Sequence, residues 1–425
     1  MVELNFNPGD FVEIRLAKDE LKAKVLESSD SSVMLLKLDS GYNIGIPRDN
    51  ILAGKVLRRF KENENVEKFE FKRKEGLKSI GLIVTGGTIA SKLDPRTGGV
   101  KWLTNLDEFI KFYPELLEIA NVKEIEVPFM VASESMTSEH WIKIAESAKK
   151  MLDDKDIEGV IVTHGTDFLG YTAGALSFFL RDLNKPVVLT YSQRSIDRAS
   201  SDANLNLQCA ARMAISDCAE VVVVGHATLN DDYCYALPGS KTRKMHSSRR
   251  DAFKVINDIP IAKVWPDRVE FLRKYDKRDN KRKVELDVNF SDKVALVKFY
   301  PGQDASILDF YALKNKGIIV EASGLGHLPV GEAGHNWLAT IKKHIRNGFV
   351  VCCAAQTING RLDPLVYSNG RELIDAGVIF LEDMLSESAF VKLGWVLGHR
   401  GWVGKAKEKM LENFAGELNE SLRVE

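Results

Sequence analysis

Hydrophobic and polar positions follow two different patterns along the chain, and the change comes near residue 75. Before that point, short apolar runs of strand-like composition alternate with turn-forming residues, and no helical periodicity interrupts them. These runs lie at 10–15, 22–26, 33–38 and 41–46. Closely spaced short strands predict a small β-barrel. We therefore expect residues 1–75 to form a barrel-like amino-terminal domain.

From about residue 78 the pattern predicts strands that alternate with helices. Apolar, β-branched runs typical of parallel strands buried on both faces lie at 81–84, 159–162, 187–190 and 221–224. Apolar residues recur at helical spacing over 139–152 and 171–180. This alternation predicts an α/β domain built on a parallel sheet, which we expect to cover residues 78–275.

A second, smaller α/β domain is expected at 293–425, after a polar, charge-dense linker at 276–292. Its strand candidates lie near 294–297, 317–320, 349–354 and 378–381. The predicted fold class is therefore α/β, with a two-domain parallel-sheet core preceded by a small all-β domain.

Composition and charge argue against several classes of protein. The chain has 425 residues, 28% charged residues and a net charge of −1, without the basic bias of a protein dominated by phosphate-backbone contacts. The amino terminus lacks the pattern of a signal peptide, so we expect a cytoplasmic protein. The five cysteines form no Cys-x-x-Cys pair, and the histidines show no metal-ligand spacing, so we expect buried thiols and no metal site.

Two threonine turns carry the candidate chemistry. Thr-Gly-Gly-Thr at 85–88 and Thr-His-Gly-Thr-Asp at 163–167 each follow a predicted buried strand directly. Functional groups of parallel α/β sheets lie at the carboxyl ends of strands. Glycines in such turns let a substrate approach the backbone, whose N–H groups can stabilise an oxyanion. A threonine hydroxyl becomes a useful nucleophile only beside a base, so two such turns with an Asp and a Lys indicate acyl transfer.

Residues 78–425 resemble the L-asparaginase family through these two signatures. The resemblance implies that Thr88 is the nucleophile and that Thr166, Asp167 and Lys244 are the other catalytic residues. The segment 243–253 resembles the neighbourhood of the family's catalytic lysine, which selects Lys244 over Lys241.

The same resemblance implies substrate contacts. Ser133 and Glu134 correspond to the loop that holds the α-carboxylate and α-amine, with Glu where the family often has Gln, and Gly87 and Gly165 line the site. The chain departs from many relatives in two places. Residues 92–101 contain no tyrosine, and Gly-Leu-Gly-His at 324–327 replaces a Gly- and Asn-rich turn.

The barrel followed by an asparaginase-like body resembles the amidase (D) subunits of the archaeal glutamyl-tRNA(Gln) amidotransferases. That resemblance implies hydrolysis of asparagine or glutamine and transfer of ammonia to a partner E subunit. The partner uses ATP and Mg²⁺ to convert Glu-tRNA(Gln) to Gln-tRNA(Gln), and this chain needs no cofactor. A homodimer within a heterotetramer is expected, with the tRNA bound mainly by the partner.

Two alternatives stay open. One is a free-standing cytosolic L-asparaginase with an accessory domain. The other is a catalytically silent subunit whose barrel binds protein or RNA. Partner-dependent activity separates the three hypotheses.

Overall fold

The computed structural model describes residues 5–28, 30–39, 43–60, 73–94, 97, 100–102, 113–198, 200–331 and 336–421. These residues form two compact units. The smaller unit contains the amino-terminal strands together with described residues of 90–112 and 194–201, and the larger unit contains the rest. The charged stretch at 58–68, whose sequence predicts an exposed connection to the main body, lies mostly outside the described residues.

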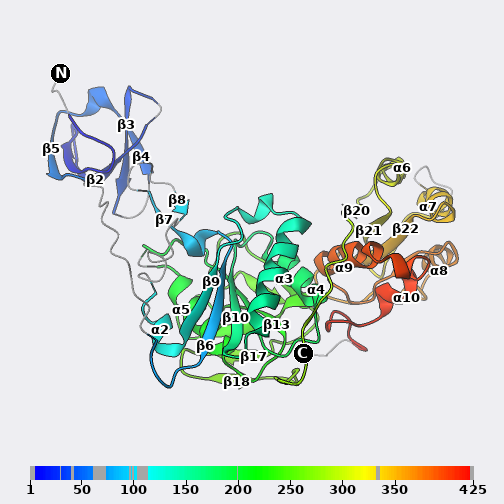
Figure 1. Ribbon diagram of the computed structural model, residues 1–425. Helices are drawn as coiled ribbons and strands as arrows, with labels where there is room; N and C mark the ends of the chain where they lie inside the picture. The colour runs from blue at the N-terminus through cyan, green and yellow to red at the C-terminus, as the bar shows by residue number, and fades with distance from the viewer. Residues whose placement is uncertain are drawn as a thin grey trace. The chain divides into compact units, whose positions relative to one another are not determined.

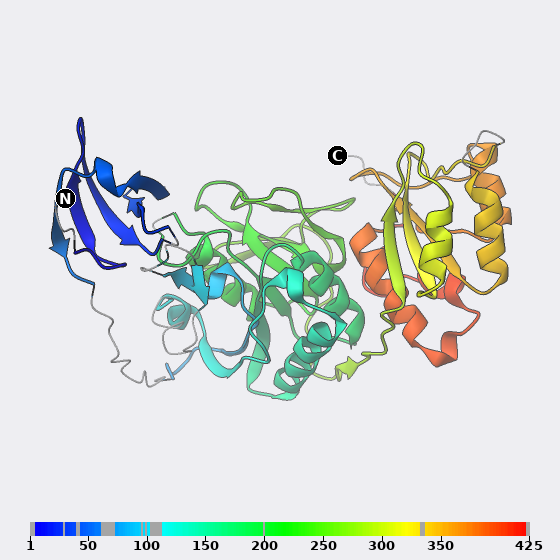
Figure 2. The same ribbon diagram turned by 90° about the horizontal axis from the view of Figure 1, so that it is seen from above.

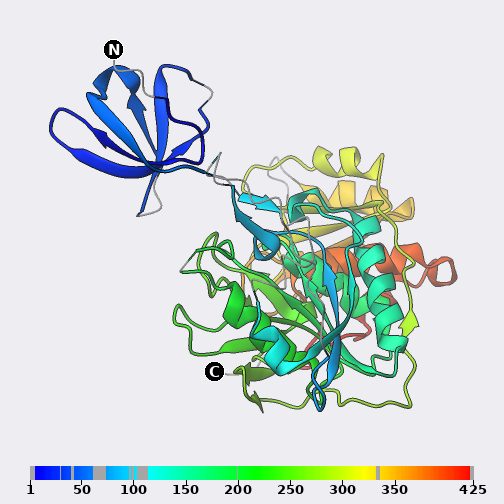
Figure 3. The same cartoon turned by 60° about the vertical axis from the view of Figure 1, so that its left-hand side comes forward.

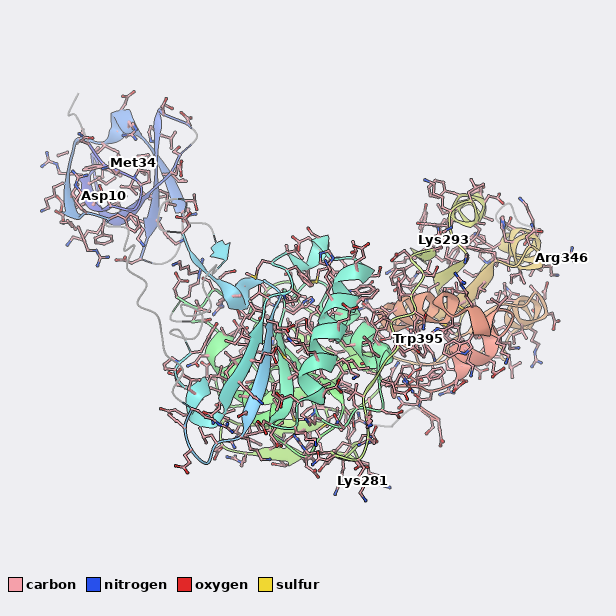
Figure 4. All side chains as sticks on the ribbon, viewed as in Figure 1. Asp10, Met34, Lys281, Lys293, Arg346 and Trp395 are labelled. Carbon is pink, nitrogen blue, oxygen red and sulfur yellow. The ribbon has the colours of Figure 1, made fainter. Side chains whose placement is uncertain are left out.

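The amino-terminal strands form a curled antiparallel sheet in the order β4-β3-β2-β1-β5 (Figure 3, dark blue). Alternate residues of a strand face opposite sides, and the inward set here includes Val12, Ile14, Met34 and Leu36. Met34, labelled in Figure 4, is 1% exposed. The strands are β1 (Phe11–Arg15), β2 (Glu20–Leu26), β3 (Val33–Leu38), β4 (Asn43–Pro47) and β5 (Ala53–Arg58). A single 3₁₀ turn, η1 (Arg48–Asn50), joins β4 to β5.

A buried carboxylate closes this sheet. Asp10 is 1% exposed and accepts hydrogen bonds from the backbone N–H groups of Asn7 (3.0 Å) and Phe60 (2.9 Å). Arg59 Nη1 lies 2.9 Å from the same carboxylate. Burial alone would raise the pKa of Asp10, but these donors together lower it below its usual value. The start of β1 is thus tied to the residues that follow β5.

The smaller unit also contains the hairpin of β7 (Ser91–Leu93) and β8 (Val100–Trp102). Within this unit, the backbone N–H of Ile196 donates to the carbonyl of Ser91 (3.3 Å). The chain passes from the larger unit into the smaller one between Ile89 and Ala90, immediately after the first threonine turn.

The catalytic domain of the larger unit is built on an eight-stranded sheet in the order β18-β17-β14-β13-β12-β10-β6-β9. Five of these strands are parallel: β6 (Ser79–Val84), β9 (Asn121–Glu126), β10 (Ile157–Thr163), β12 (Val187–Thr190) and β13 (Val221–His226). All of them except β9 were predicted from the sequence. Three later strands, which were not predicted, extend this sheet at one edge and run antiparallel: β14 (Cys234–Pro238), β17 (Ala262–Val264) and β18 (Val269–Phe271). Short loops join β13 to β14 and β17 to β18, and such connections allow antiparallel but not parallel pairing.

Helices cover both faces of this sheet. Figure 1 shows α3 (Ser138–Asp153) and α4 (Leu169–Phe179) on one face, and α5 (Ala203–Ala214) with α2 (Leu116–Ile119) on the other. Two small sheets complete the domain: β11 (Leu180–Arg181) with β19 (Glu285–Leu286), and β15 (Thr242–Lys244) with β16 (Phe253–Val255).

The carboxyl-terminal domain has a four-stranded parallel sheet of β20 (Val294–Lys298), β21 (Gly317–Ala322), β22 (Val350–Ala355) and β23 (Ile379–Phe380). Its helices are α6 (Ser306–Ala312), α7 (Trp337–Arg346), α8 (Ser368–Asp375), α9 (Ser386–Gly398) and α10 (Ala406–Leu411). Figure 2 shows α9, in orange, between this sheet and the catalytic domain. There Trp395 of α9 stacks on Phe178 of α4, with ring centroids 5.6 Å apart. The α/β fold class with a preceding all-β domain is confirmed.

All five cysteines are buried and unbridged. Burial raises the pKa of the Cys353 thiol to about 12, so it stays a neutral apolar filler. Among the described residues, no helix is long and apolar enough to cross a membrane.

We predict that Asp10→Asn lowers the free energy of unfolding of the barrel by about 2 kcal/mol, because it removes a buried charge and leaves its donors poorly matched. Since the pKa of Asp10 is lowered in the fold, its contribution is present above about pH 4 and is lost as the pH falls. Denaturant unfolding of the full chain at pH 7 and pH 3 measures both effects. Asp19→Asn, at an exposed position, is the control, and an equal loss in both variants would contradict the assignment.

Candidate active site

The two threonine turns begin side by side. Strands β6 and β10 are parallel neighbours, and Val84 is in register with Thr163, so both strands end at the same level. Thr85 donates to the carbonyl oxygen of Thr163 from its backbone N (3.3 Å) and from its Oγ1 (2.8 Å). The sheet therefore presents both signatures at one point of its carboxyl edge.

Glycines let the two turns touch backbone to backbone. Gly86 and Gly87 have φ values of +115° and +81°, a conformation that residues with a side chain rarely adopt. A Cβ on Gly87 would lie 2.6 Å from Cα of Gly165, and a Cβ on Gly86 would lie 2.7 Å from the carbonyl oxygen of Val131. Thr88 and Thr166 each follow this contact by one residue, so the two threonines emerge at the same edge.

Lys244 joins the second turn. Its Nζ donates to Thr166 Oγ1 at 2.7 Å and lies 2.8 Å from Asp167 Oδ1. The Lys244 side chain is 13% exposed, whereas that of Asp167 is 62% exposed. The two residues of the second signature and the lysine thus form one hydrogen-bonded triad from β15 and the loop before α4. No contact between Lys244 and Thr88 is observed among the described interactions.

Lys241 occupies a different place, although it lies only three residues earlier. Its Nζ donates to Asp383 Oδ2 at 2.9 Å, and both side chains are buried. Asn419 also donates to this carboxylate, from its backbone N (3.0 Å) and its side chain (2.7 Å). The pair fixes η4 (Gly239–Lys241) to the carboxyl-terminal domain directly before β15 begins. The geometry therefore places Lys244, not Lys241, beside the second threonine turn, and its catalytic role stays a prediction.

The loop before α3 packs against the second threonine turn. Ser133 is 4% exposed, lies against Gly165, and accepts a hydrogen bond from the backbone N of Phe168 at 3.4 Å. Glu134 is exposed, and both residues line a cavity of about 420 Å³. The other walls are largely aromatic and come from both domains, including Trp141, Phe168, Tyr171, Phe290 and Phe390.

His164 supports the second turn, a role that the sequence analysis missed. The ring is fully buried, and burial lowers the pKa of His164 to about 4, so the imidazole is neutral. Nδ1 lies 2.7 Å from the carbonyl oxygen of Gly165, which can only accept, so we assign the proton to Nδ1. Nε2 then accepts from Thr172 Oγ1 at 2.9 Å. The ring links the turn to α4, and its place inside the second signature was the signal available in the sequence.

Tyr113 supports the first turn and was also missed. Its hydroxyl donates to the carbonyl of Ile89 at 2.8 Å, and the side chain is 2% exposed. Burial holds the pKa of Tyr113 well above its usual value, so the hydroxyl stays protonated. The segment 92–101, which contains no tyrosine, is described only in part and includes residues of β7 and the start of β8.

The arrangement offers the parts of acyl transfer: two hydroxyls, an amine beside one of them, and backbone N–H groups in glycine turns. Within the described ranges, no cluster of three or more His, Cys, Asp or Glu side chains could hold a metal ion.

Comparisons with known proteins agree with this geometry. Family models match residues 79–277 ("Asparaginase, N-terminal"), 293–410 ("Glutaminase/Asparaginase C-terminal domain") and 6–57 ("GatD N-terminal domain"). Among solved structures, the thermostable L-asparaginase from Thermococcus kodakarensis superposes with a TM-score of 0.71 and 30% identity, covering 81% of this chain and all of that one. Fold and site thus define an amidohydrolase of the asparaginase type.

The whole chain, barrel included, matches one group of relatives. The glutamyl-tRNA(Gln) amidotransferase D subunit of Thermococcus kodakarensis is 46% identical over 98% of this chain and 96% of its own length. The D subunit of Pyrococcus abyssi is 47% identical over 100% of this chain and 97% of its own. The protein belongs to the family of glutamyl-tRNA(Gln) amidotransferase D subunits, as its sequence motifs indicated.

We predict that Lys244→Met lowers kcat/KM for side-chain amide hydrolysis by about 10²- to 10⁴-fold, the usual range for loss of a positioned acid–base group. Ammonia release measured at saturating substrate gives kcat, and release at limiting substrate gives kcat/KM. Lys281→Met, at an exposed position of the same unit, should leave them unchanged. Full activity of Lys244→Met would remove this lysine from the catalytic set.

A second prediction concerns the neutral imidazole. Since the pKa of His164 is depressed in the fold, the folded state binds fewer protons than the unfolded chain below about pH 6.5. The native protein should therefore lose roughly 2 kcal/mol of stability between pH 7 and pH 5 that His164→Gln does not lose. Denaturant unfolding at pH 7 and pH 5 gives the free energy of unfolding of the native protein and of His164→Gln. An equal change with pH in both proteins would show that the ring is not buried in neutral form.

Proposed function

We propose that this protein hydrolyses the side-chain amide of asparagine or glutamine and supplies the ammonia to a partner E subunit, which converts Glu-tRNA(Gln) to Gln-tRNA(Gln). The observation that carries the proposal is the 2.7 Å contact of Lys244 with Thr166, in a turn packed against the turn of Thr88. The near full-length similarity to the D subunits of archaeal amidotransferases supports the transfer step.

In the proposed reaction, Thr88 Oγ1 attacks the amide carbon, a C–O bond forms and the C–N bond breaks. The hydroxyl proton passes to the leaving nitrogen through Thr166 and Lys244, so ammonia departs. Water then attacks the ester, releases aspartate or glutamate and restores the Thr88 hydroxyl. Asp167 orients Lys244 for the proton transfers, since its carboxylate holds the lysine from the solvent side.

The direct contact of Lys244 favours a second assignment of the nucleophile. In its neutral form the Lys244 amine can accept the proton of the hydroxyl that it contacts, and that hydroxyl belongs to Thr166. Mass spectrometry of an acyl-enzyme trapped on each Thr→Ala background decides between the two. An adduct that survives Thr166→Ala and is lost in Thr88→Ala supports the first assignment, and the reverse pattern supports the second.

Substrate recognition follows from the loop before α3. We propose that Ser133 binds the α-carboxylate and that Glu134 binds the α-ammonium, because a carboxylate suits a cation. We propose that Gly87 and Gly165 also line the substrate site, where the absence of a side chain lets the two turns and the Ser133 loop pack closely around it.

We further propose that ATP and Mg²⁺ bind to the partner and that this chain uses no cofactor. The net charge of −1 supports a tRNA-binding surface that lies mainly on the partner. The assembly proposed is a homodimer of this chain within a heterotetramer, acting in the cytoplasm where charged tRNA is used.

The test is ammonia release from asparagine and from glutamine by the purified chain, alone and with the E subunit, Glu-tRNA(Gln) and ATP. We predict a stimulation that depends on the charged tRNA and is accompanied by Gln-tRNA(Gln). Uncharged tRNA and the Lys244→Met variant are the controls. Equal release without the partner would favour a free-standing asparaginase, and no release under any condition would favour a silent binding subunit.

A further inference from the structure

The carboxyl-terminal domain carries a groove of about 1010 Å³ that is separate from the active site. It lies at the amino-terminal ends of β21, β22 and β23, where residues such as Lys316, Val350 and Gly377 line it. The ends of α6, α7 and α9 form its sides. None of the predicted catalytic or substrate-binding residues contributes to this groove, because they all lie in the catalytic domain.

Two aliphatic side chains at the groove are unusually exposed to solvent. Leu313, directly after α6, and Val403, directly after η5 (Arg400–Trp402), are each 83% exposed. Trp402 beside Val403 stacks on His399 with ring centroids 3.8 Å apart, and His399 is in turn bonded to Asp287. The wall that carries Val403 is therefore already ordered. Two aliphatic side chains that line the same groove and are this exposed favour it as a surface that a protein partner covers.

The rim of the groove is basic. Its lining includes Lys316, Lys343 and Lys407, and its carboxylate is Asp309. Asp309 already accepts from Lys343 at 2.8 Å and lies 2.6 Å from His344 Nε2. Because Asp309 is already paired, Lys316 and Lys407 give the lining of the groove a net positive charge. The chain as a whole has a net charge of −1. Figure 4 shows two further basic residues, Lys293 and Arg346, on the same domain.

We propose that this groove binds an amphipathic, acidic helix of the partner E subunit. Apolar side chains at i, i+3 or i+4 and i+7 of such a helix would cover Leu313 and Val403, and acidic side chains on its flanks would meet Lys316 and Lys407. The inference rests on the proposed function for the existence of the partner.

The apolar positions favour a protein over RNA as the occupant. RNA binding depends on phosphate contacts and on aromatic rings free to stack on bases, and aliphatic tips such as Leu313 and Val403 serve neither. Trp402 is also engaged by His399 on one face. The volume is at the upper limit for small-molecule pockets, and a groove of this size suits a chain segment better than an amino acid.

The test uses two double variants of the full chain. Leu313→Ser with Val403→Ser removes the apolar contacts, and Lys316→Glu with Lys407→Glu reverses the rim charge. The matched controls are Leu365→Ser with Val366→Ser, which are 54% and 55% exposed elsewhere on the domain, and Lys281→Glu with Lys283→Glu, outside the groove. Calorimetric titration with the purified E subunit at 50 mM and 500 mM salt gives the affinities.

We expect each groove variant to weaken E binding at least tenfold at low salt, with the controls unchanged. The loss caused by charge reversal should shrink at high salt, because exposed charges are screened, whereas the loss caused by the serine pair should persist. Unchanged unfolding midpoints and unchanged asparagine hydrolysis by the isolated chain would show that the variants are folded.

Three results would overturn the inference. Wild-type affinity of both groove variants would remove the groove from the interface while leaving the proposed function intact. Normal E binding with weaker tRNA binding of the assembled complex would make RNA the occupant, and dissociation of the chain's own dimer in sedimentation would make it a second copy. A wild-type chain that binds no E subunit at all would instead defeat the proposed function as well.

Discussion

The direct parallel pairing of β6 with β10 is the constraint on which the active site depends. Because the two strands end in register, the loops that follow them must share one small volume, and only glycine backbones fit there. A side chain at Gly87 would force the turns apart, since its Cβ would overlap the backbone of Gly165. The two threonine turns therefore meet as a consequence of sheet register, and the neutral ring of His164 holds the second turn in that position.

The position of Lys244 depends on contacts with the carboxyl-terminal domain. Lys241 and Asp383 form a buried ion pair that also engages Asn419 near the carboxyl terminus of the chain. Such pairs contribute little net stability but fix one arrangement, since either partner alone would be a buried unpaired charge. The arrangement fixed here is the start of β15, which ends at Lys244. Asp383 and Asn419, which lie outside the candidate active site, thus help to position the amine of Lys244.

Much of this could be predicted from the sequence, for reasons that differ between elements. The buried parallel strands are continuous apolar runs, and α3 has clear helical spacing, so both were predicted within a few residues. The antiparallel edge strands β17 and β18 are only three residues each, too short for a periodic signal. Tyr113 and Asp383 were missed because their roles arise from contacts made only in the folded chain. The catalytic roles themselves remain predictions from motif resemblance and geometry.

The passage of the chain from one unit to the other at Ala90 has a kinetic consequence. A free surface loop rearranges in nanoseconds to microseconds, whereas a segment that is part of a folded domain moves with that domain, in microseconds to milliseconds. The hairpin of β7 and β8 belongs to the unit that contains the barrel. We therefore expect the described hairpin residues that follow Thr88 to rearrange in microseconds to milliseconds, as parts of a folded domain do, and this range approaches the time of one enzymatic turnover.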